Sequence, residues 1–425
     1  MKISIPHIHK IEGEAGFWAK VAQTGKVDEL KIETLTGLRQ IEGILIGRKI
    51  KEVPIVVSRI CGICPVVHIL NACVALEKAL EIKITPLTIL LRKLFLASQI
   101  IQSHTLHLFF MSLADFFNIE NDLDLMKKFP KEAEAAIKIR DFSLKITKII
   151  GGRSVHPMTA QIGGFSKLPD KDGLEKILKE TPEVLNAAQI LIKTFRDLSY
   201  PNLKRETKFV SLYSNKEYPF YQANYIKIGD EILTPADFYS NKIEENLKTP
   251  PAKRVKYKGE PYMPGPMARI KNNRQLLSSL SKAVFEEFLK TKGLSEKDFF
   301  ENRFYNLFSQ AIEILYFLEK SQEWIKEILE SNLKESIPEV KITKGSGLSA
   351  MEAPRGTLFT YFEIDKNGRL INCNIITPTA QFLTNIEEDL KIFLPNILNL
   401  SDKERKRKIR SLIRAYDPCI SCAIH

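Results

Sequence analysis

Two Cys-x-x-Cys pairs stand near opposite ends of the chain, and they constrain its fold more than any other feature. Cys61 and Cys64 form the first pair, and Cys419 and Cys422 form the second, 355 positions beyond Cys64. Each pair offers two thiolates from one tight turn, so two pairs can close around one metal. A fold that uses them together must bring both ends of a 425-residue chain to one place.

The spacing of these pairs leaves the metal open. Thiolate ligands are typical of zinc sites, iron–sulfur clusters, and nickel or copper centres. A four-cysteine zinc site usually joins its pairs across tens of residues, which the separation here argues against only mildly. Six cysteines in a chain of this length are too few for a disulfide framework, and their spacing indicates metal or redox chemistry.

Composition excludes several classes of protein. Apolar residues make up 44% of the chain, enough for a large core and too many for a disordered or collagen-like protein. The formal net charge of +12 is spread along the sequence, which is typical of solvated helix faces. The one dense basic run, KERKRKIR at 403–410, is predicted to be helical and to face solvent, a partner subunit or nucleic acid.

The start of the chain lacks the apolar region of a secretory signal, and no window of about 20 apolar residues predicts a membrane span. We therefore expect a cytoplasmic protein without a membrane-spanning segment.

Hydrophobic periodicity predicts a mainly helical protein with peripheral β-hairpins. We expect one large domain over residues 1–425, with a β-hairpin region at about 1–36 and a small β-rich insertion at about 208–266. An extended run is predicted at 53–58, and an Asn-Gly turn predicts a hairpin at 357–376. Pro-rich turns are expected in the insertion, in TPPAK and GEPYMPGP. Helices are predicted at about 39–50, 65–80, 86–117, 122–150, 171–199, 273–291, 298–330, 385–396 and 401–415.

The residues around the cysteines carry a resemblance to a known family. Arg59 to His68 reads R-I-C-G-I-C-P-V-V-H, and Asp417 to His425 reads D-P-C-I-S-C-A-I-H. Both resemble the nickel-binding signatures of NiFe hydrogenase large subunits at every fixed position. Four segments between them also resemble the family, in its order: HTLHLFF (104–110), GGRSVHP (151–157), EAPRG (352–356) and NIITPTAQ (374–381). The resemblance covers essentially the whole chain, although the insertion is not diagnostic.

This resemblance implies a helical-bundle fold whose buried centre holds nickel and an iron with CO and cyanide ligands. Cys61 and Cys419 would bind nickel alone, whereas Cys64 and Cys422 would bridge to the iron. The implied activity is reversible heterolytic cleavage of H2 to protons and electrons, with nickel as the Lewis acid. Cys419 would take the proton.

The resemblance implies catalytic roles for Glu12 and Arg355, and supporting positions for Asp417 and Ser103. Glu12 resembles the glutamate that receives the proton from the terminal cysteine. The family more often has Arg and His where this chain has Lys10 and Glu14, which leaves the route beyond Glu12 open. Arg355 resembles the arginine that lies over the iron, because its rigid charged fork suits anionic cyanide. Asp417 retains a carboxylate beside that arginine, whereas Ser103 stands where many relatives carry Asp.

Further residues are implied to support the metals. His68 lies four residues past Cys64 and is expected to tune a bridging sulfur, although a helix histidine can also be satisfied by backbone. Thr379, after Pro378, resembles the hydroxyl that hydrogen-bonds a cyanide. Alternatively, it is a turn-forming threonine. Near the C-terminus a magnesium or other divalent ion is implied, with three ligands: Glu42, His425 and the backbone carbonyl of Ile375.

Partners follow partly from chemistry. The remaining cysteines, Cys73 and Cys373, are predicted to be small buried hydrophobes, so the chain has no cysteine set for iron–sulfur clusters. Electrons must therefore leave through an iron–sulfur small subunit. D-P-C-I-S-C resembles the cytoplasmic subfamily, whose partners carry flavin and NAD(P), deazaflavin or heterodisulfide-reductase activity. The resemblance also implies a maturation protease that removes a C-terminal extension.

Three alternatives remain at this stage. An H2-sensing regulatory subunit would have the same site with slow turnover. A quinone-reductase-type relative would keep the fold without the metal, which four intact cysteines argue against. A zinc-stabilised nucleic-acid-binding protein would explain the cysteines and the net charge differently. We expect no nucleic-acid partner.

Overall fold

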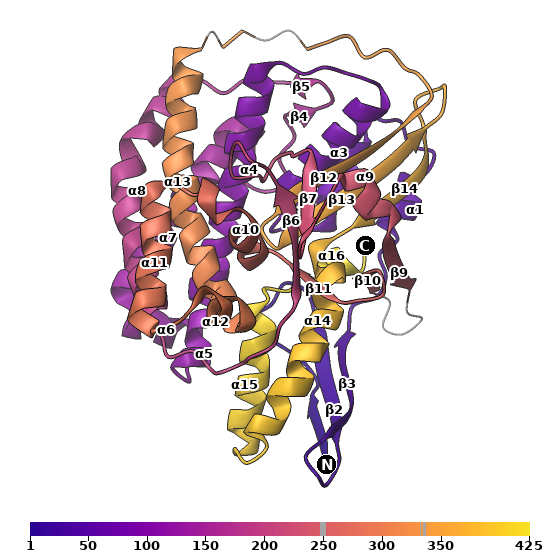
Figure 1. Cartoon of the computed structure of the whole chain (residues 1–425). Helices are drawn as coiled ribbons and strands as arrows, with labels where there is room; N and C mark the ends of the chain where they lie inside the picture. The colour runs from indigo at the N-terminus through magenta and orange to yellow at the C-terminus, as the bar shows by residue number, and fades with distance from the viewer. Residues whose placement is uncertain (247–251, 332, 335–336) are drawn as a thin grey trace.

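The computed structural model describes residues 1–246, 252–331, 333–334 and 337–425. Its largest layer is a bundle of long antiparallel and crossing helices, drawn on the left of Figure 1. Four of them pack on one another through continuous apolar faces: α4 (Pro86–Leu106), α7 (Pro130–Gly151), α8 (Lys171–Asp197) and α13 (Asn306–Glu330). Shorter helices flank the bundle: α5 (Leu113–Phe116), α6 (Asp122–Lys128), α11 (Ser279–Lys292) and α12 (Glu296–Glu301).

A three-stranded antiparallel sheet lies beside the bundle. Its strands are β12 (Gly345–Ala353), β13 (Gly356–Ile364) and β14 (Leu370–Ile376), in that order. Helix α3 (Pro65–Ala79) packs on β12 and β13 and is buried along almost its whole length. Gly347 permits this close packing, because a Cβ at that position would lie 2.0 Å from the Ala75 carbonyl oxygen. The first cysteine pair therefore begins a central helix.

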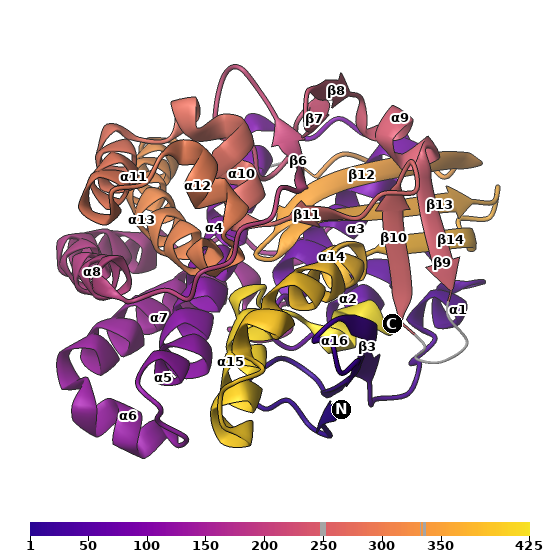
Figure 2. The ribbon, with the colours of Figure 1, turned by 60° about the horizontal axis from the view of Figure 1, so that its bottom comes forward.

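The N-terminal strands form a second antiparallel sheet: β1 (Lys2–Ile5), β2 (Ala15–Val21) and β3 (Val27–Thr34). Helix α14 (Pro378–Phe393) contacts β3, and it is followed by α15 (Asp402–Ala415) and the short α16 (Ile420–Ala423). Figure 2 shows these C-terminal helices on the same face as the N-terminal strands. Both ends of the chain thus meet next to α3.

The segment predicted as a β-rich insertion packs onto the central sheet. Its elements are β6 (Lys208–Tyr213), β7 (Tyr225–Ile228), β8 (Glu231–Leu233), α9 (Pro235–Ser240), β9 (Lys242–Asn246), β10 (Lys253–Tyr257) and β11 (Tyr262–Pro264). Apolar residues of these strands share one core cluster with Phe359 and Ile376 of the central sheet. Pro264 ends β11, in the predicted GEPYMPGP turn, and α10 (Pro266–Asn273) follows it. Residues 249–251 of the predicted TPPAK turn (249–253) lie outside the described residues.

The predicted mainly helical fold is confirmed, with local corrections. The run at 53–58 is not extended: it forms α2 (Val53–Val57) and a 3-10 turn (Ser58–Ile60), because Pro54 at the first turn suits a helix start. The helix predicted at 39–50 is only α1 (Ile41–Leu45), since Gly47 has a φ of +81°. The predicted helix at 86–117 includes a π-turn (His107–Ser112), and Pro130 starts α7 as a separate helix. The strand β12 was not predicted.

Candidate metal centre

Four cysteines from the two ends of the chain meet at the centre of the molecule. Cys61 follows the 3-10 turn, and Cys64 is the N-cap of α3, while Cys419 is the N-cap of α16 and Cys422 lies within it. The Sγ atoms of Cys61 and Cys419 are 3.6 Å apart, and those of Cys64 and Cys422 are 3.4 Å apart. All four sulfurs lie within 4.8 Å of one another, and each residue is at most 3% exposed.

The chemistry of this donor set fits a bound cation. Burial raises the pKa of Cys419 and of Cys422 well above the ordinary value of a thiol. Hydrogen bonds from Cys419 and then from the other thiols hold the pKa of Cys61 well below that value. Four thiolates this close in a dry interior repel one another, so the fully deprotonated cluster requires a metal cation.

Local hydrogen bonds fix the backbone of each pair, and the Arg39 guanidinium joins the two by donating to the Ile60 and Ser421 carbonyls. In the first turn, the N–H groups of Ile63 and Cys64 both donate to the Cys61 sulfur at 3.3 Å. In the second turn, the Cys419 N–H donates to the Thr379 hydroxyl at 3.0 Å, and the Thr377 hydroxyl donates to the Cys422 carbonyl at 3.0 Å. The first turn is therefore held by its own backbone, and the second is held by the start of α14.

Glu12 reaches the metal centre from the N-terminal region. Its Oε2 accepts hydrogen bonds from the Cys419 thiol at 2.9 Å and the Ser421 N–H at 3.1 Å, and its Oε1 accepts one from the Ser421 hydroxyl at 2.5 Å. The Glu12 carbonyl also accepts from the Ile420 N–H at 2.8 Å. Gly13 makes this approach possible, because its φ is +77° and a Cβ would lie 2.9 Å from the Ile420 side chain.

Arg355 occupies the tip of the tight hairpin between β12 and β13. Its Nε donates to the Asp417 carbonyl at 2.7 Å, and its Nη2 donates to Asp417 Oδ1 at 2.8 Å. Asp417 adopts a φ of +54°, a conformation that Asp tolerates better than most residues, and its carbonyl and Oδ1 both face the guanidinium. Ser103, which stands where many relatives carry Asp, places its hydroxyl 3.4 Å from Nη1, at the limit of a hydrogen bond.

A small cavity opens beside Cys64 and Cys422, the second cysteine of each pair. It is lined mainly by apolar groups and by Arg355, His68 and Thr379. The remaining lining residues are Ala353, Pro354, Leu358, Pro378 and Cys419. The Thr379 hydroxyl accepts from the backbone, so its own hydrogen is free to point into the cavity. His68 Nε2 lies 3.7 Å from the Cys422 sulfur, and burial lowers the pKa of His68 to about 4.

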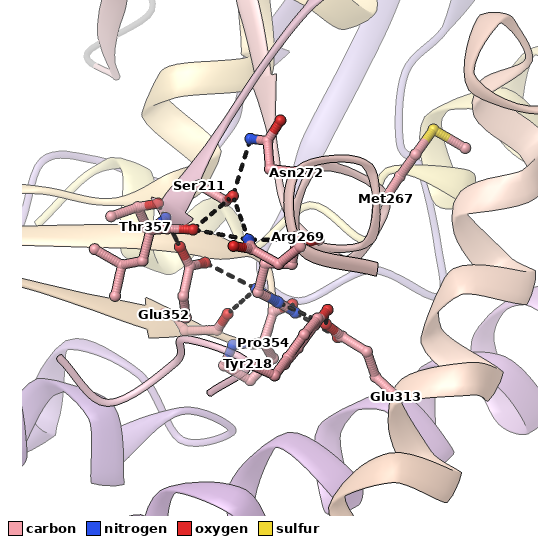
Figure 3. Close-up of polar contacts among 12 residues, drawn as sticks. Ser211, Tyr218, Met267, Arg269, Asn272, Glu313, Glu352, Pro354 and Thr357 are labelled. Carbon is pink, nitrogen blue, oxygen red and sulfur yellow. Dashed lines mark hydrogen bonds and ion pairs between the residues drawn. The ribbon is translucent and has the colours of Figure 1, made fainter. Parts of the chain in front are cut away.

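A buried ionic network holds the Arg355 hairpin. Arg269 of α10 donates to both carboxylate oxygens of Glu313, at 2.7 and 2.5 Å, and to Glu352 at 3.0 Å. It also donates to the carbonyls of Ala353 and Pro354 at 2.9 and 3.1 Å, immediately before Arg355. Figure 3 shows the guanidinium between the two carboxylates and beside Pro354.

The carboxylates of this network differ in their titration. Burial alone would raise the pKa of Glu313, but Arg269 and His104 hold it at about 2. Burial raises the pKa of Glu352 above its ordinary value, although Arg269 opposes the shift. His104 begins the family-like segment HTLHLFF, and its Nε2 lies 2.9 Å from Glu313 Oε2.

The three residues predicted to hold a divalent ion also come together. His425 Nε2 lies 3.1 Å from the Ile375 carbonyl oxygen and 3.6 Å from Glu42 Oε1. The ammonium group of Lys253 lies in the same cluster, 2.8 Å from Glu42 Oε1. Burial alone would raise the pKa of Glu42, but His425 and Lys253 hold it at about 2.

Sequence reasoning missed Lys253, Arg269 and Ser421. Lys253 and Arg269 lie in or beside the region without diagnostic segments, and no local pattern indicates their partners. Ser421 stands inside the second cysteine pair, where its contact with Glu12 depends on the meeting of both chain ends.

Two other predictions concern the remaining cysteines and the basic run. Cys73 is buried, and burial raises the pKa of its thiol to about 12, so the thiol stays neutral. This agrees with the prediction of a small buried hydrophobe. Cys373 on β14 is only half-buried, although it packs against the main core. The basic run lies on α15, where Arg405 and Lys406 pair with Asp402.

Comparisons with known proteins agree with this geometry. The family model described as nickel-dependent hydrogenase matches residues 39–137 and 218–425. The chain is 33% identical to the alpha chain of sulfhydrogenase 1 from Pyrococcus furiosus, over 100% of this chain and 98% of that protein. It is 26% identical to a chain of the vhu F420-non-reducing hydrogenase from Methanocaldococcus jannaschii, over 92% of this chain and 98% of that protein.

A solved structure has the same fold. An NAD+-reducing NiFe hydrogenase in its H2-reduced state superposes with a TM-score of 0.89 at 24% identity, covering 100% of this chain and 99% of that one. This chain therefore belongs to the nickel-dependent hydrogenase family. Within that family it is a large subunit, the catalytic chain of an oxidoreductase that acts on H2. None of the helices in the described part of the chain meets the length and apolarity needed to cross a lipid bilayer.

Proposed function

We propose that this chain cleaves and forms H2 reversibly at a nickel–iron centre whose iron carries CO and cyanide. The observation that carries the proposal is the convergence of four buried cysteine sulfurs within 4.8 Å. The donor set fits soft metals, and the adjoining cavity is the size of small diatomic ligands rather than of an organic cofactor. When bound, the centre supplies Lewis-acidic metal that polarises H2.

The position of each cysteine relative to the small cavity supports separate roles for the cysteines. Cys64 and Cys422 adjoin the small cavity and would hold both metals, whereas Cys61 lies outside it and would hold nickel alone. Cys419 would also hold nickel alone, although it touches the cavity rim. It is the cysteine whose sulfur meets a carboxylate.

Cys419 and Glu12 form the start of a proton route in this proposal. The Cys419 sulfur takes the proton released by H2 cleavage, and Glu12 Oε2 accepts it across 2.9 Å. The Ser421 hydroxyl lies 2.5 Å from the other carboxylate oxygen and keeps Glu12 oriented. A carboxylate within hydrogen-bond reach of the atom that holds the proton meets the geometric requirement for a general base.

Arg355 and Thr379 would bind the diatomic ligands. Arg355 presents a fixed positive charge to the cavity because Asp417 holds two of its nitrogens. Thr379, which also lines the cavity, offers a hydroxyl hydrogen. Charged and neutral donors of this kind suit anionic cyanide, while the apolar walls suit CO.

We further propose a cytoplasmic heteromer. Four of the six cysteines form the centre, Cys73 is buried elsewhere and Cys373 lies on β14, so electrons must leave through a partner with iron–sulfur clusters. The names of the relatives indicate subunits of larger enzymes, including one that reduces NAD+ and one that does not reduce F420. A partner chain with flavin and NAD(P), or one of the deazaflavin or heterodisulfide-reductase type, is therefore expected.

Infrared spectroscopy of the purified complex tests this function. Bands in the region where metal-bound CO and cyanide absorb, with nickel present, are the expected result. A spectrum without such bands from protein that carries only zinc in the four-cysteine site would refute the proposal and favour a zinc-stabilised protein. Protein matured in its own host is needed, so that a blank spectrum reflects the protein rather than missing maturation enzymes.

A further inference from the structure

A compact cluster of oxygen atoms lies beyond α16, on the side of the metal centre away from the helical bundle. Glu42 of α1, the carbonyl of Ile375 at the end of β14 and the ring of His425 all face it. Glu42 Oε1 is fixed by the Ile375 N–H at 2.6 Å, and the side chain of Glu42 is 22% exposed. These are the atoms expected to bind a hard divalent cation.

Lys253 fills the same cluster from β10. Its Nζ lies 2.8 and 3.1 Å from the two Glu42 oxygens, 2.9 Å from Asn374 Oδ1 and 3.4 Å from the Ile375 carbonyl oxygen. An ammonium has three protons, and three separate groups accept them here. The Lys253 side chain is 17% exposed, so bulk water screens this charge only in part.

We propose that Lys253 serves as the resident cation of this cluster and takes the place of the divalent ion. Magnesium requires oxygen ligands at about 2.0–2.1 Å in near-octahedral geometry. Two of the ligand atoms expected for it, Glu42 Oε1 and the Ile375 oxygen, already lie within 3.4 Å of the ammonium. A dication bound to the same oxygens would lie close to a like charge in a partly desolvated site, which destabilises it.

The cluster lies against the C-terminal segment, so Lys253 can stabilise that segment. His425 Nδ1 lies 2.6 Å from the Cys422 carbonyl, and Arg39 N–H donates to the Ile424 carbonyl at 3.0 Å. Through Glu42 and Ile375, Lys253 therefore ties β10 to the segment that carries Cys419 and Cys422. This step rests on the proposed function only in treating the four cysteines as the nickel site.

Elemental analysis of the intact, active complex tests the proposal directly. After dialysis against a chelator we expect nickel and iron to remain, with magnesium, manganese and calcium each far below one equivalent per nickel. Activity and unfolding temperature should not change. One tightly held equivalent of a hard divalent ion per nickel would overturn the proposal, whereas a lack of nickel and of the infrared bands before dialysis would instead count against the proposed function.

A variant makes the test independent of residual metal. Lys253→Met should lower the unfolding temperature, and added Mg²⁺ alone should restore it by binding the vacated oxygens. Lys258→Met is the matched control, because that lysine is exposed in the adjoining turn and pairs with Glu231. In this control the unfolding temperature should not fall, and added Mg²⁺ should not raise it. A Lys253→Met protein as stable as the unaltered one, or one that Mg²⁺ does not stabilise, would contradict the proposal. If the variant fails to fold, the elemental analysis decides.

Discussion

Glu12 and Glu14 stand two residues apart, yet only Glu12 reaches a sulfur. The Glu12 carbonyl accepts a hydrogen bond from the Ile420 N–H. This backbone contact places the Glu12 carboxylate next to the Cys419 sulfur. Glu14, in the same segment, is exposed. At the scale of single residues, one backbone hydrogen bond therefore decides which of the two carboxylates can accept a proton from Cys419.

Glu12→Gln should uncouple proton transfer from the metal centre. Glutamine keeps the size of the side chain and one acceptor for Ser421, but it cannot accept a proton, so we expect H2 oxidation to fall by about 10²–10⁴-fold. Nickel content and infrared bands should be unchanged. Glu14→Gln is the matched control and should keep full activity; comparable losses in both variants would exclude the proposed role of Glu12.

Arg355→Lys should disturb the metal centre although charge is conserved. Lysine cannot bind both the carbonyl and the carboxylate of Asp417 in the way that the guanidinium fork does. We expect shifted cyanide bands in the infrared spectrum and an activity at least about tenfold lower. Ser103→Ala should leave both nearly unchanged, because its 3.4 Å contact is weak. Unshifted bands in Arg355→Lys would show that Arg355 does not face the ligands.

At the scale of elements, the hairpin between β12 and β13 is held by a helix that is remote in sequence. Helix α10 places Arg269 under the two-residue turn, where it binds two backbone carbonyls and two buried carboxylates. Gly356 completes the turn with a φ of +130°, and a Cβ there would lie 2.5 Å from Pro264. The position of Arg355 therefore depends on packing between three segments.

Arg269→Met should be strongly destabilising. The substitution leaves the carboxylates of Glu313 and Glu352 buried without a positive partner. Removing one partner of a buried ion pair lowers the free energy of unfolding by about 3–5 kcal/mol. Chemical denaturation of the purified complex measures this loss. Lys193→Met removes an exposed pair with Asp197 and should cost less than about 1 kcal/mol. Equal effects of the two substitutions would show that the Arg269 network contributes no special stability.

At the scale of the whole molecule, acid should weaken the fold through Glu313. Its pKa in the folded protein is about 2, below the ordinary value of 4.5. A depressed pKa contributes stability above about pH 4.5 that is lost as the pH falls toward 2. The unfolding temperature of Glu313→Gln should therefore vary less over this range than that of the unaltered protein. Glu327→Gln, exposed on the same helix, is the control and should retain the full pH dependence.

Local patterns predict the helical layers well. Pro65 after Cys64 predicts the start of α3, and the Asn-Gly turn predicts the hairpin of β13 and β14. The mistakes fall where tertiary contacts decide the conformation. The extended run predicted at 53–58 is apolar and short, so its pattern fits a strand and a buried helix equally well. Strand β12 lacks alternation because α3 covers one of its faces and β6 lies near it.

The candidate site also has residues that the sequence predicts and residues that it does not. The four cysteines, Glu12, Arg355 and Asp417 lie within recognisable sequence segments, and the structure brings them together. Arg269 and Lys253 act on that site through carboxylates from distant helices and strands. No window of sequence contains both members of such a pair, so their roles depend on the three-dimensional fold.

The placement of the four sulfurs at both ends of the chain also has a consequence for biosynthesis. A ribosome that adds about 5–20 residues per second would release the Cys64 thiol roughly 20–70 s before the Cys419 thiol exists. During that interval the first pair lacks the partners that it later meets at 3.4 and 3.6 Å. Nascent chains therefore carry two unshielded thiols that a free metal ion or an oxidant can capture. Capture at that stage would remove the first pair from the site before the second pair is made.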